Sequence, residues 1–148
     1  MIKKVIKIFR PILIFGMRSW WYITRPKTAG VKVVIIHENK ILLIKTTYGY
    51  KYSLPGGGIK RNETPEAAIK RETREEVGIL LNEVIELPSF VTHEEYKEDT
   101  VHSFYSEVKT RDCKLDLFEI DKAEWYPIDN LPKTGPVTAK IINLFKNK

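Results

Sequence analysis

Residues 54–79 read LPGGGIKRNETPEAAIKRETREEVGI, and this stretch decides the fold expected for the chain. Three glycines open it. Thr64 then provides a good N-cap, and Pro65 suits the first helical position because its missing N–H costs nothing there. Gly78 suits the left-handed conformation that commonly ends a helix. The stretch therefore predicts a glycine turn followed by a helix over residues 65–77.

Acidic side chains lie in an unusual position on this predicted helix. At about 100° per residue, Glu72 and Glu76 fall among the apolar residues, and Glu75 borders the same sector. Carboxylates crowded on a half-buried face repel one another and lose solvation unless a cation lies between them. Oxygen ligands at this density suit Mg²⁺ or Mn²⁺. The simpler alternative, a solvated charged helix, would place these carboxylates opposite the apolar residues.

The spacing of the same stretch resembles the Nudix box, G-x5-E-x7-R-E-U-x-E-E-x-G-U, in which U is a bulky apolar residue. Gly57 and Glu63 match its first two fixed positions, and residues 71–79, RETREEVGI, match the rest. Thr73 is the one departure, at the first U position, and should affect packing more than chemistry. The flanking strand order and residues 125–128, WYPI, also resemble the family.

This resemblance implies a fold and a reaction. The fold is of the α+β class, an α/β/α sandwich with a mixed β-sheet and the Nudix loop-helix motif. The enzyme would be a Nudix-type diphosphohydrolase that acts on acid anhydrides. Its reaction would be Mg²⁺- or Mn²⁺-dependent hydrolysis of a diphosphate linkage in a small nucleotide of the nucleoside diphosphate-X type.

The resemblance also implies roles for individual residues. Glu72 or Glu75 would take the proton of the attacking water. Arg71 would orient Glu63, or another carboxylate of the box, through a charge-assisted pair. The metal ligands would be Gly56, through its carbonyl, Glu72, Glu75 and Glu76. The substrate-binding residues would be Tyr52, Gly57 and Gly58.

One further metal ligand is expected outside the box. In several Nudix enzymes an additional acid lies in the loop before a strand that bears a tryptophan, here Trp125. We choose Glu119, six residues before Trp125, because this spacing can place it in the loop facing the box helix. A solvated acid is the alternative. The other acids of this stretch are Asp112, Asp116, Asp121 and Glu124.

Composition indicates one globular domain in a chain of 148 residues, of which 43% are hydrophobic and 30% charged. A single cysteine, Cys113, fits a reducing compartment, so we expect a cytoplasmic protein. Residues 1–37 hold eight lysines or arginines and no acid, which accounts for the excess in the net charge of +6. No basic stripe crosses the rest of the chain, so no dedicated nucleic-acid-binding domain is expected.

The chain divides into a basic, apolar N-terminal helical segment with a linker, residues 1–29, and a Nudix hydrolase domain, residues 30–148. Within residues 1–23, apolar and basic side chains alternate at helical spacing. This helix either packs on the domain through Trp20 and Trp21 or contacts an anionic membrane surface. Its longest uncharged run is far too short to span a bilayer.

Hydrophobic patterning predicts the remaining elements, and the loops between them would set specificity. The expected strands are residues 30–37, 41–46, 80–92, 100–109 and 123–128, and Pro136 begins a final helix. Three interpretations stay open. A non-catalytic nucleotide sensor would keep the fold without turnover. An isopentenyl-diphosphate isomerase would need Cys113 as a catalytic thiol, although it lies in a predicted loop. The third is a membrane-recruited structural module, carried by residues 1–23. For the assembly, a homodimer is left open.

Overall fold

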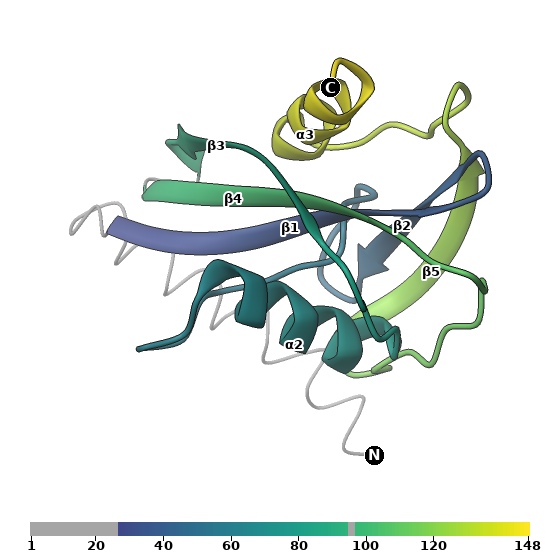
Figure 1. Ribbon diagram of the computed structural model, residues 1–148, viewed down its shortest axis with the longest axis horizontal. Helices are drawn as coiled ribbons and strands as arrows, with labels where there is room; N and C mark the ends of the chain where they lie inside the picture. Colours follow the sequence, from purple (N-terminus) through teal and green to yellow (C-terminus); the bar gives the residue numbers. More distant parts are fainter. Residues whose placement is uncertain (1–26, 95–96) are drawn as a thin grey trace.

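The computed structural model describes residues 27–94 and 97–148, which form a five-stranded mixed sheet between two helices (Figure 1). The predicted sandwich is confirmed. The helix predicted in residues 1–23, and its membrane contact, lie outside the described residues. The strands are β1 (Lys27–His37), β2 (Lys40–Thr46), β3 (Ile85–Thr92), β4 (Glu98–Glu107) and β5 (Ile120–Pro127), and the helices are α2 (Pro65–Val77) and α3 (Pro136–Lys146).

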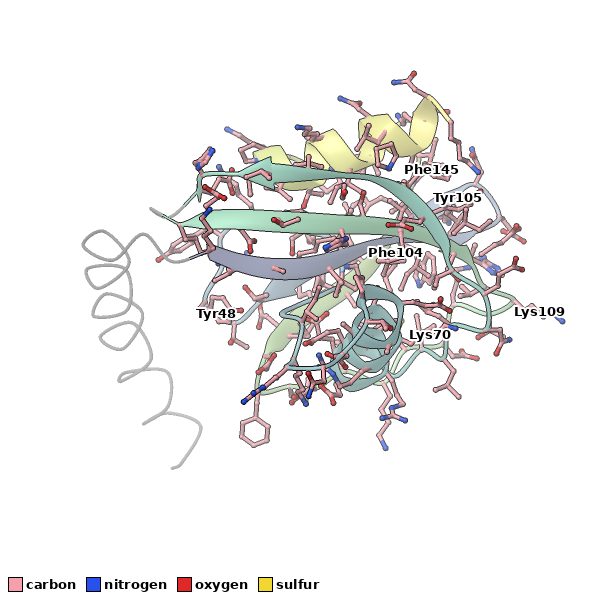
Figure 2. The ribbon with its side chains drawn as sticks, turned by 60° about the vertical axis from the view of Figure 1, so that its left-hand side comes forward. Tyr48, Lys70, Phe104, Tyr105, Lys109 and Phe145 are labelled. Carbon is pink, nitrogen blue, oxygen red and sulfur yellow. The ribbon has the colours of Figure 1, made fainter. Side chains whose placement is uncertain are left out.

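The strand order is β3-β4-β1-β2-β5, and β1 pairs with β4 in parallel while the other pairs are antiparallel. The core has two parts, one on each face of the sheet, because successive residues of a strand point to opposite faces. Figure 2 shows this in β4, where Phe104 points toward α2 and Tyr105 lies beside Phe145 of α3. Neither helix of the described residues has the length and hydrophobicity that a transmembrane helix needs.

Helix α2 begins and ends where its local sequence predicts. The Thr64 hydroxyl accepts a hydrogen bond from the Ala67 N–H at 3.2 Å, and Pro65 occupies the first turn. Gly78 adopts φ +71° and its N–H donates to the Arg74 carbonyl. These are short-range signals, so they could be read without knowing the tertiary structure.

Three strands, β1, β3 and β5, begin three or more residues away from the expected position, and β5 begins at Ile120 instead of residue 123. β1 begins at Lys27 instead of residue 30, because Lys27–Gly30 pair in register with the start of β4. β3 begins at Ile85, five residues later than expected. Ile79 and Leu81 alternate as strand residues do, yet they are buried in the core beneath α2 without joining the sheet.

The glycine stretch occupies a split in the sheet. β1 and β2 pair only next to their hairpin, at the Ile36–Ile41 and His37–Lys40 positions, and then diverge. Residues 53–59 fill the gap. On one side the N–H groups of β1 donate to this segment, and on the other side Ser53 exchanges both backbone hydrogen bonds with β2. These bonds are Val31 N to Gly57 O at 2.9 Å, Val33 N to Pro55 O at 3.1 Å, Ser53 N to Ile44 O at 2.8 Å and Ile44 N to Ser53 O at 2.9 Å.

Two of the three glycines leave no space for a side chain. A Cβ on Gly56 would lie 2.0 Å from the Val31 carbonyl oxygen, and its φ of +142° is one that other residues rarely adopt. A Cβ on Gly57 would lie 2.5 Å from the Glu72 carboxyl carbon. A Cβ on Gly58 would meet nothing within 4 Å. Close approach to the backbone of β1 therefore explains Gly56, whereas the neighbour of Gly57 is the carboxylate end of the Glu72 side chain, which can move.

We expect Gly56→Ala to destabilise the protein by roughly 3 kcal/mol or more, because the methyl group collides with β1 and the backbone is strained. Gly58→Ala is the matched control and should change stability by less than about 0.5 kcal/mol. Chemical denaturation of the two variants measures both values. Equal stabilities would contradict the insertion of this segment against β1.

Candidate active site

The three carboxylates of the box that lie on α2, those of Glu72, Glu75 and Glu76, lie at three depths. The Glu76 residue is 7% exposed, whereas the side chains of Glu72 and Glu75 are 15% and 51% exposed. Thr73, at the departure from the Nudix box, is fully buried, and its hydroxyl has no hydrogen-bond partner among the described residues. Thr73 therefore fills the apolar position of the box without joining the polar cluster.

Arg71 holds the outer carboxylates. Its Nε and Nη2 donate to the two oxygens of Glu63 at 2.7 and 2.9 Å. Its Nη1 donates to Glu72 at 2.7 Å and to Glu75 at 3.2 Å, and Nη2 also donates to the Gly58 carbonyl at 3.0 Å. These bonds lower the pKa of Glu63 to about 2 and raise that of Arg71. One guanidinium thus ties the box helix to the loop before it.

Glu76 lies on the inner side of the helix, where the Gly56 N–H donates to its Oε2 at 2.9 Å. Burial raises the pKa of Glu76 to about 7, against the opposing effects of Lys32 and of this hydrogen bond. The negative charges of Glu72 and Glu119 contribute to this rise in the pKa of Glu76. Glu119, chosen from its spacing to the tryptophan, therefore lies within electrostatic range of Glu76.

Lys32 is a charged residue of this site that sequence reasoning missed. It lies in β1 between Val31 and Val33, both almost fully buried. Its Nζ donates to the Leu54 carbonyl at 2.9 Å and approaches the Gly56 carbonyl at 3.4 Å. The available signal was a single charge inside an apolar strand. A lysine is rarely buried there without a partner, so its position indicates that polar groups lie nearby.

A cleft of about 860 Å³ opens next to the glycine segment and the N-terminal end of α3. Tyr52 and Gly56–Gly58, the expected substrate-binding residues, line it. So do residues on both sides of the loop that follows β3, among them Thr92 and Asp99. The lysines that line the cleft are Lys27, Lys32, Lys51 and Lys97. The cleft therefore combines positive charge with an aromatic side chain.

Tyr52 is fixed at its hydroxyl end. The hydroxyl donates to the Glu124 carboxylate, which also accepts a hydrogen bond from the Tyr126 hydroxyl at 3.1 Å. The rings of Tyr52 and Tyr126 meet edge to face, with centroids 5.4 Å apart. The bond to Glu124 raises the pKa of Tyr52, so its hydroxyl stays protonated and keeps donating. Cys113 is exposed in the loop between β4 and β5.

The donor set fits a hard divalent cation in its chemistry, although no three acidic, histidine or cysteine side chains of residues 27–94 and 97–148 converge on one point. Glu72 and Glu75 turn to Arg71 instead. All the nearby ligands are oxygens, and Glu76 is buried next to further negative charge. A cation would relieve that repulsion. Binding would require Glu72 and Glu75 to turn away from the guanidinium.

Comparison with known proteins agrees with this architecture. Residues 26–145 match the NUDIX domain family. A Bacillus subtilis (strain 168) protein named "Putative 8-oxo-dGTP diphosphatase" is 30% identical over 122 residues, covering 81% of this chain and 80% of that protein. An RNA pyrophosphohydrolase of Hydrogenovibrio crunogenus (strain DSM 25203 / XCL-2) is 39% identical over 51 residues, which cover 34% of this chain and 31% of that protein.

The crystal structure of a MutT NUDIX hydrolase from Burkholderia pseudomallei has the same fold, with a TM-score of 0.73 at 22% identity, covering 80% of this chain and 97% of that one. A mixed sheet between two helices, with a glycine segment leading into a carboxylate-bearing helix, is the architecture of a Nudix hydrolase. The chain belongs to the Nudix family. It is a diphosphohydrolase of that family, which generally uses divalent cations.

The raised pKa of Glu76 predicts how the metal-free protein responds to pH. Its folded-state pKa is about 7 and its ordinary value is 4.5, so the folded protein binds this proton more tightly than the unfolded chain. Protonation of Glu76 therefore favours the folded state, and the stability that it contributes should be lost as the pH rises from about 4.5 to 7. In EDTA, Glu76→Gln should therefore melt roughly a few degrees above wild type at pH 8 and with it at pH 5.

Thermal denaturation at the two pH values measures this difference. Glu66→Gln is the control, since Glu66 lies on the same helix and pairs with Lys70 on its outer side. A Glu76→Gln variant that is less stable than wild type at both pH values would contradict the prediction.

Proposed function

We propose that the chain hydrolyses the diphosphate linkage of a nucleoside diphosphate derivative in a reaction that requires Mg²⁺. The observation that supports this proposal most directly is that the glycine segment lies between the buried carboxylate of Glu76 and the cleft. On one side its Gly56 N–H is bonded to Glu76, and on the other side Gly56–Gly58 line a cleft with four lysines and Tyr52. Lysines attract phosphate groups and an aromatic ring stacks on a base. The two curated relatives are named for nucleotide or RNA substrates, which supports a nucleotide here.

The acids of the site would have two roles, holding the cation and accepting a proton. The Gly56 carbonyl with Glu72, Glu75, Glu76 and Glu119 would hold the cation. When bound, Mg²⁺ neutralises phosphate charge and lowers the pKa of a bound water. Glu72 or Glu75, the more exposed carboxylates of the helix, would accept the proton of the attacking water.

The remaining groups position the reactants. Arg71, held in place by Glu63, would keep Glu72 and Glu75 oriented until the cation binds. Glu63 stays ionised for this role because its pKa is lowered to about 2. Tyr52, anchored through Glu124, would stack on the base. Lys27 and Lys51 would face the phosphates from the wall of the cleft.

A hydrolysis screen with Mg²⁺ tests the proposal. The substrates are nucleoside triphosphates, ADP-ribose, dinucleoside polyphosphates, capped or triphosphorylated RNA, and nucleotide sugars. Release of a phosphate or nucleoside monophosphate product with one of these classes, abolished by EDTA, is expected. Binding without turnover across the whole panel would favour the nucleotide sensor instead.

On the best substrate, Glu75→Gln and Glu76→Gln should each lower kcat by about 100-fold or more, because the cation needs the negative charge that glutamine lacks. Glu66→Gln, on the exposed face of the same helix, is the control and should retain wild-type turnover. Steady-state kinetics and a thermal melt separate loss of activity from loss of fold. Wild-type kcat in both site variants would overturn the metal assignment.

Glu119→Gln should lower turnover and raise the Mg²⁺ concentration that gives half-maximal activity, because it removes a negative charge that acts on Glu76. Asp116→Asn is the matched control from the same loop, where the Asp116 carboxylate accepts a hydrogen bond from the Phe118 N–H. A titration of activity against Mg²⁺ measures the change. A shift in Asp116→Asn with none in Glu119→Gln would show that the ligand is Asp116.

A further inference from the structure

The two cations of the site serve different carboxylates. Arg71 bonds to Glu63, Glu72 and Glu75 on the outer side of α2. Glu76, the most buried of the acids, has a hydrogen bond from the Gly56 backbone instead. Lys32 is the positive charge that acts most strongly on Glu76. The inner carboxylate is thus balanced by a lysine from β1 and not by the arginine of its own helix.

Lys32 is held in this place from several directions. Its Nζ donates to Leu54 O and lies near Gly56 O, the carbonyl that the Nudix resemblance assigns to a metal ion. Burial lowers the pKa of Lys32, and the charges of Glu76, Glu72 and Asp99 oppose that effect. The ammonium group is bonded to two backbone carbonyls and lies in the electrostatic field of these carboxylates, an environment that a metal ion also prefers.

We propose that Lys32 is a built-in counter-ion that stabilises the metal-free site and weakens divalent-metal binding there. This inference rests on the proposed function, since it assumes that the cation binds at Gly56 and Glu76. The ammonium and the cation are attracted by the same oxygens and repel each other across a partly buried site. Occupation by the metal therefore has to overcome the charge of Lys32. Lys32 is a positioning residue in this account, because it acts through Glu76 and the Gly56 carbonyl.

The test uses Lys32→Met and Lys32→Gln, with binding of Mn²⁺ measured by calorimetry and melting measured in EDTA. Both variants remove the charge, so both should bind Mn²⁺ about tenfold more tightly or better. Glutamine keeps a donor for the Leu54 carbonyl and methionine does not. In EDTA both should melt below wild type, and Lys32→Met should melt lowest. Lys32→Gln keeps the test available if the methionine variant does not fold.

Lys27→Met is the matched control, because Lys27 lies in the same strand and lines the same cleft but pairs with Glu98 at 3.5 Å. Its Mn²⁺ affinity should stay within about twofold of wild type. Unchanged or weaker Mn²⁺ binding in both Lys32 variants would overturn the inference while leaving the proposed function intact. A folded wild-type protein that binds no Mn²⁺ would overturn the metal assignment itself, and the competition with it.

Discussion

The structure depends on one insertion, in which residues 53–59 occupy the gap between β1 and β2. The two strands separate after their hairpin, so the inner edge of β1 would expose unpaired N–H groups if nothing filled the gap. The inserted segment accepts hydrogen bonds from Val31 and Val33. This places Gly56 where its own N–H bonds to Glu76. Sheet pairing and site geometry are therefore satisfied by the same segment.

Local signals were enough to predict α2. Its capping residues, Thr64 and Gly78, act within four positions of the helix ends, and both adopt the expected conformations. The resemblance to the Nudix box then predicted the α/β/α fold, and the structure confirms it. Strand boundaries were less accurate. The start of β1 depends on pairing with β4, and the start of β3 depends on the packing of Ile79 and Leu81 in the core, so neither is determined by nearby sequence.

In the candidate site, too, the features encoded in nearby sequence could be predicted and those that depend on tertiary contacts could not. The box identifies acids and an arginine, and the structure brings Arg71 together with Glu63, Glu72 and Glu75. Glu119 was selected by spacing alone, and its metal role stays a prediction. Lys32 could not be assigned, because its partners are backbone carbonyls of an irregular segment more than twenty residues away. Sequence patterns record side-chain types, but they do not record which carbonyl oxygens lie beside them.

The parallel pairing of β1 with β4 has a consequence for how the chain folds. Thr28 bonds to Asp99, 71 residues away, and the whole of that ladder has the same separation. Closing so long a loop costs more entropy than forming the β1–β2 hairpin or docking the glycine segment. The β2–β5 ladder closes still longer loops, from Thr46–Ile120 to Lys40–Pro127. The rate-limiting search should therefore be for β4 and β5, with the hairpin, residues 53–59 and α2 free to associate earlier. The wall of the cleft that contains Asp99 would therefore form after the glycine segment on the opposite wall.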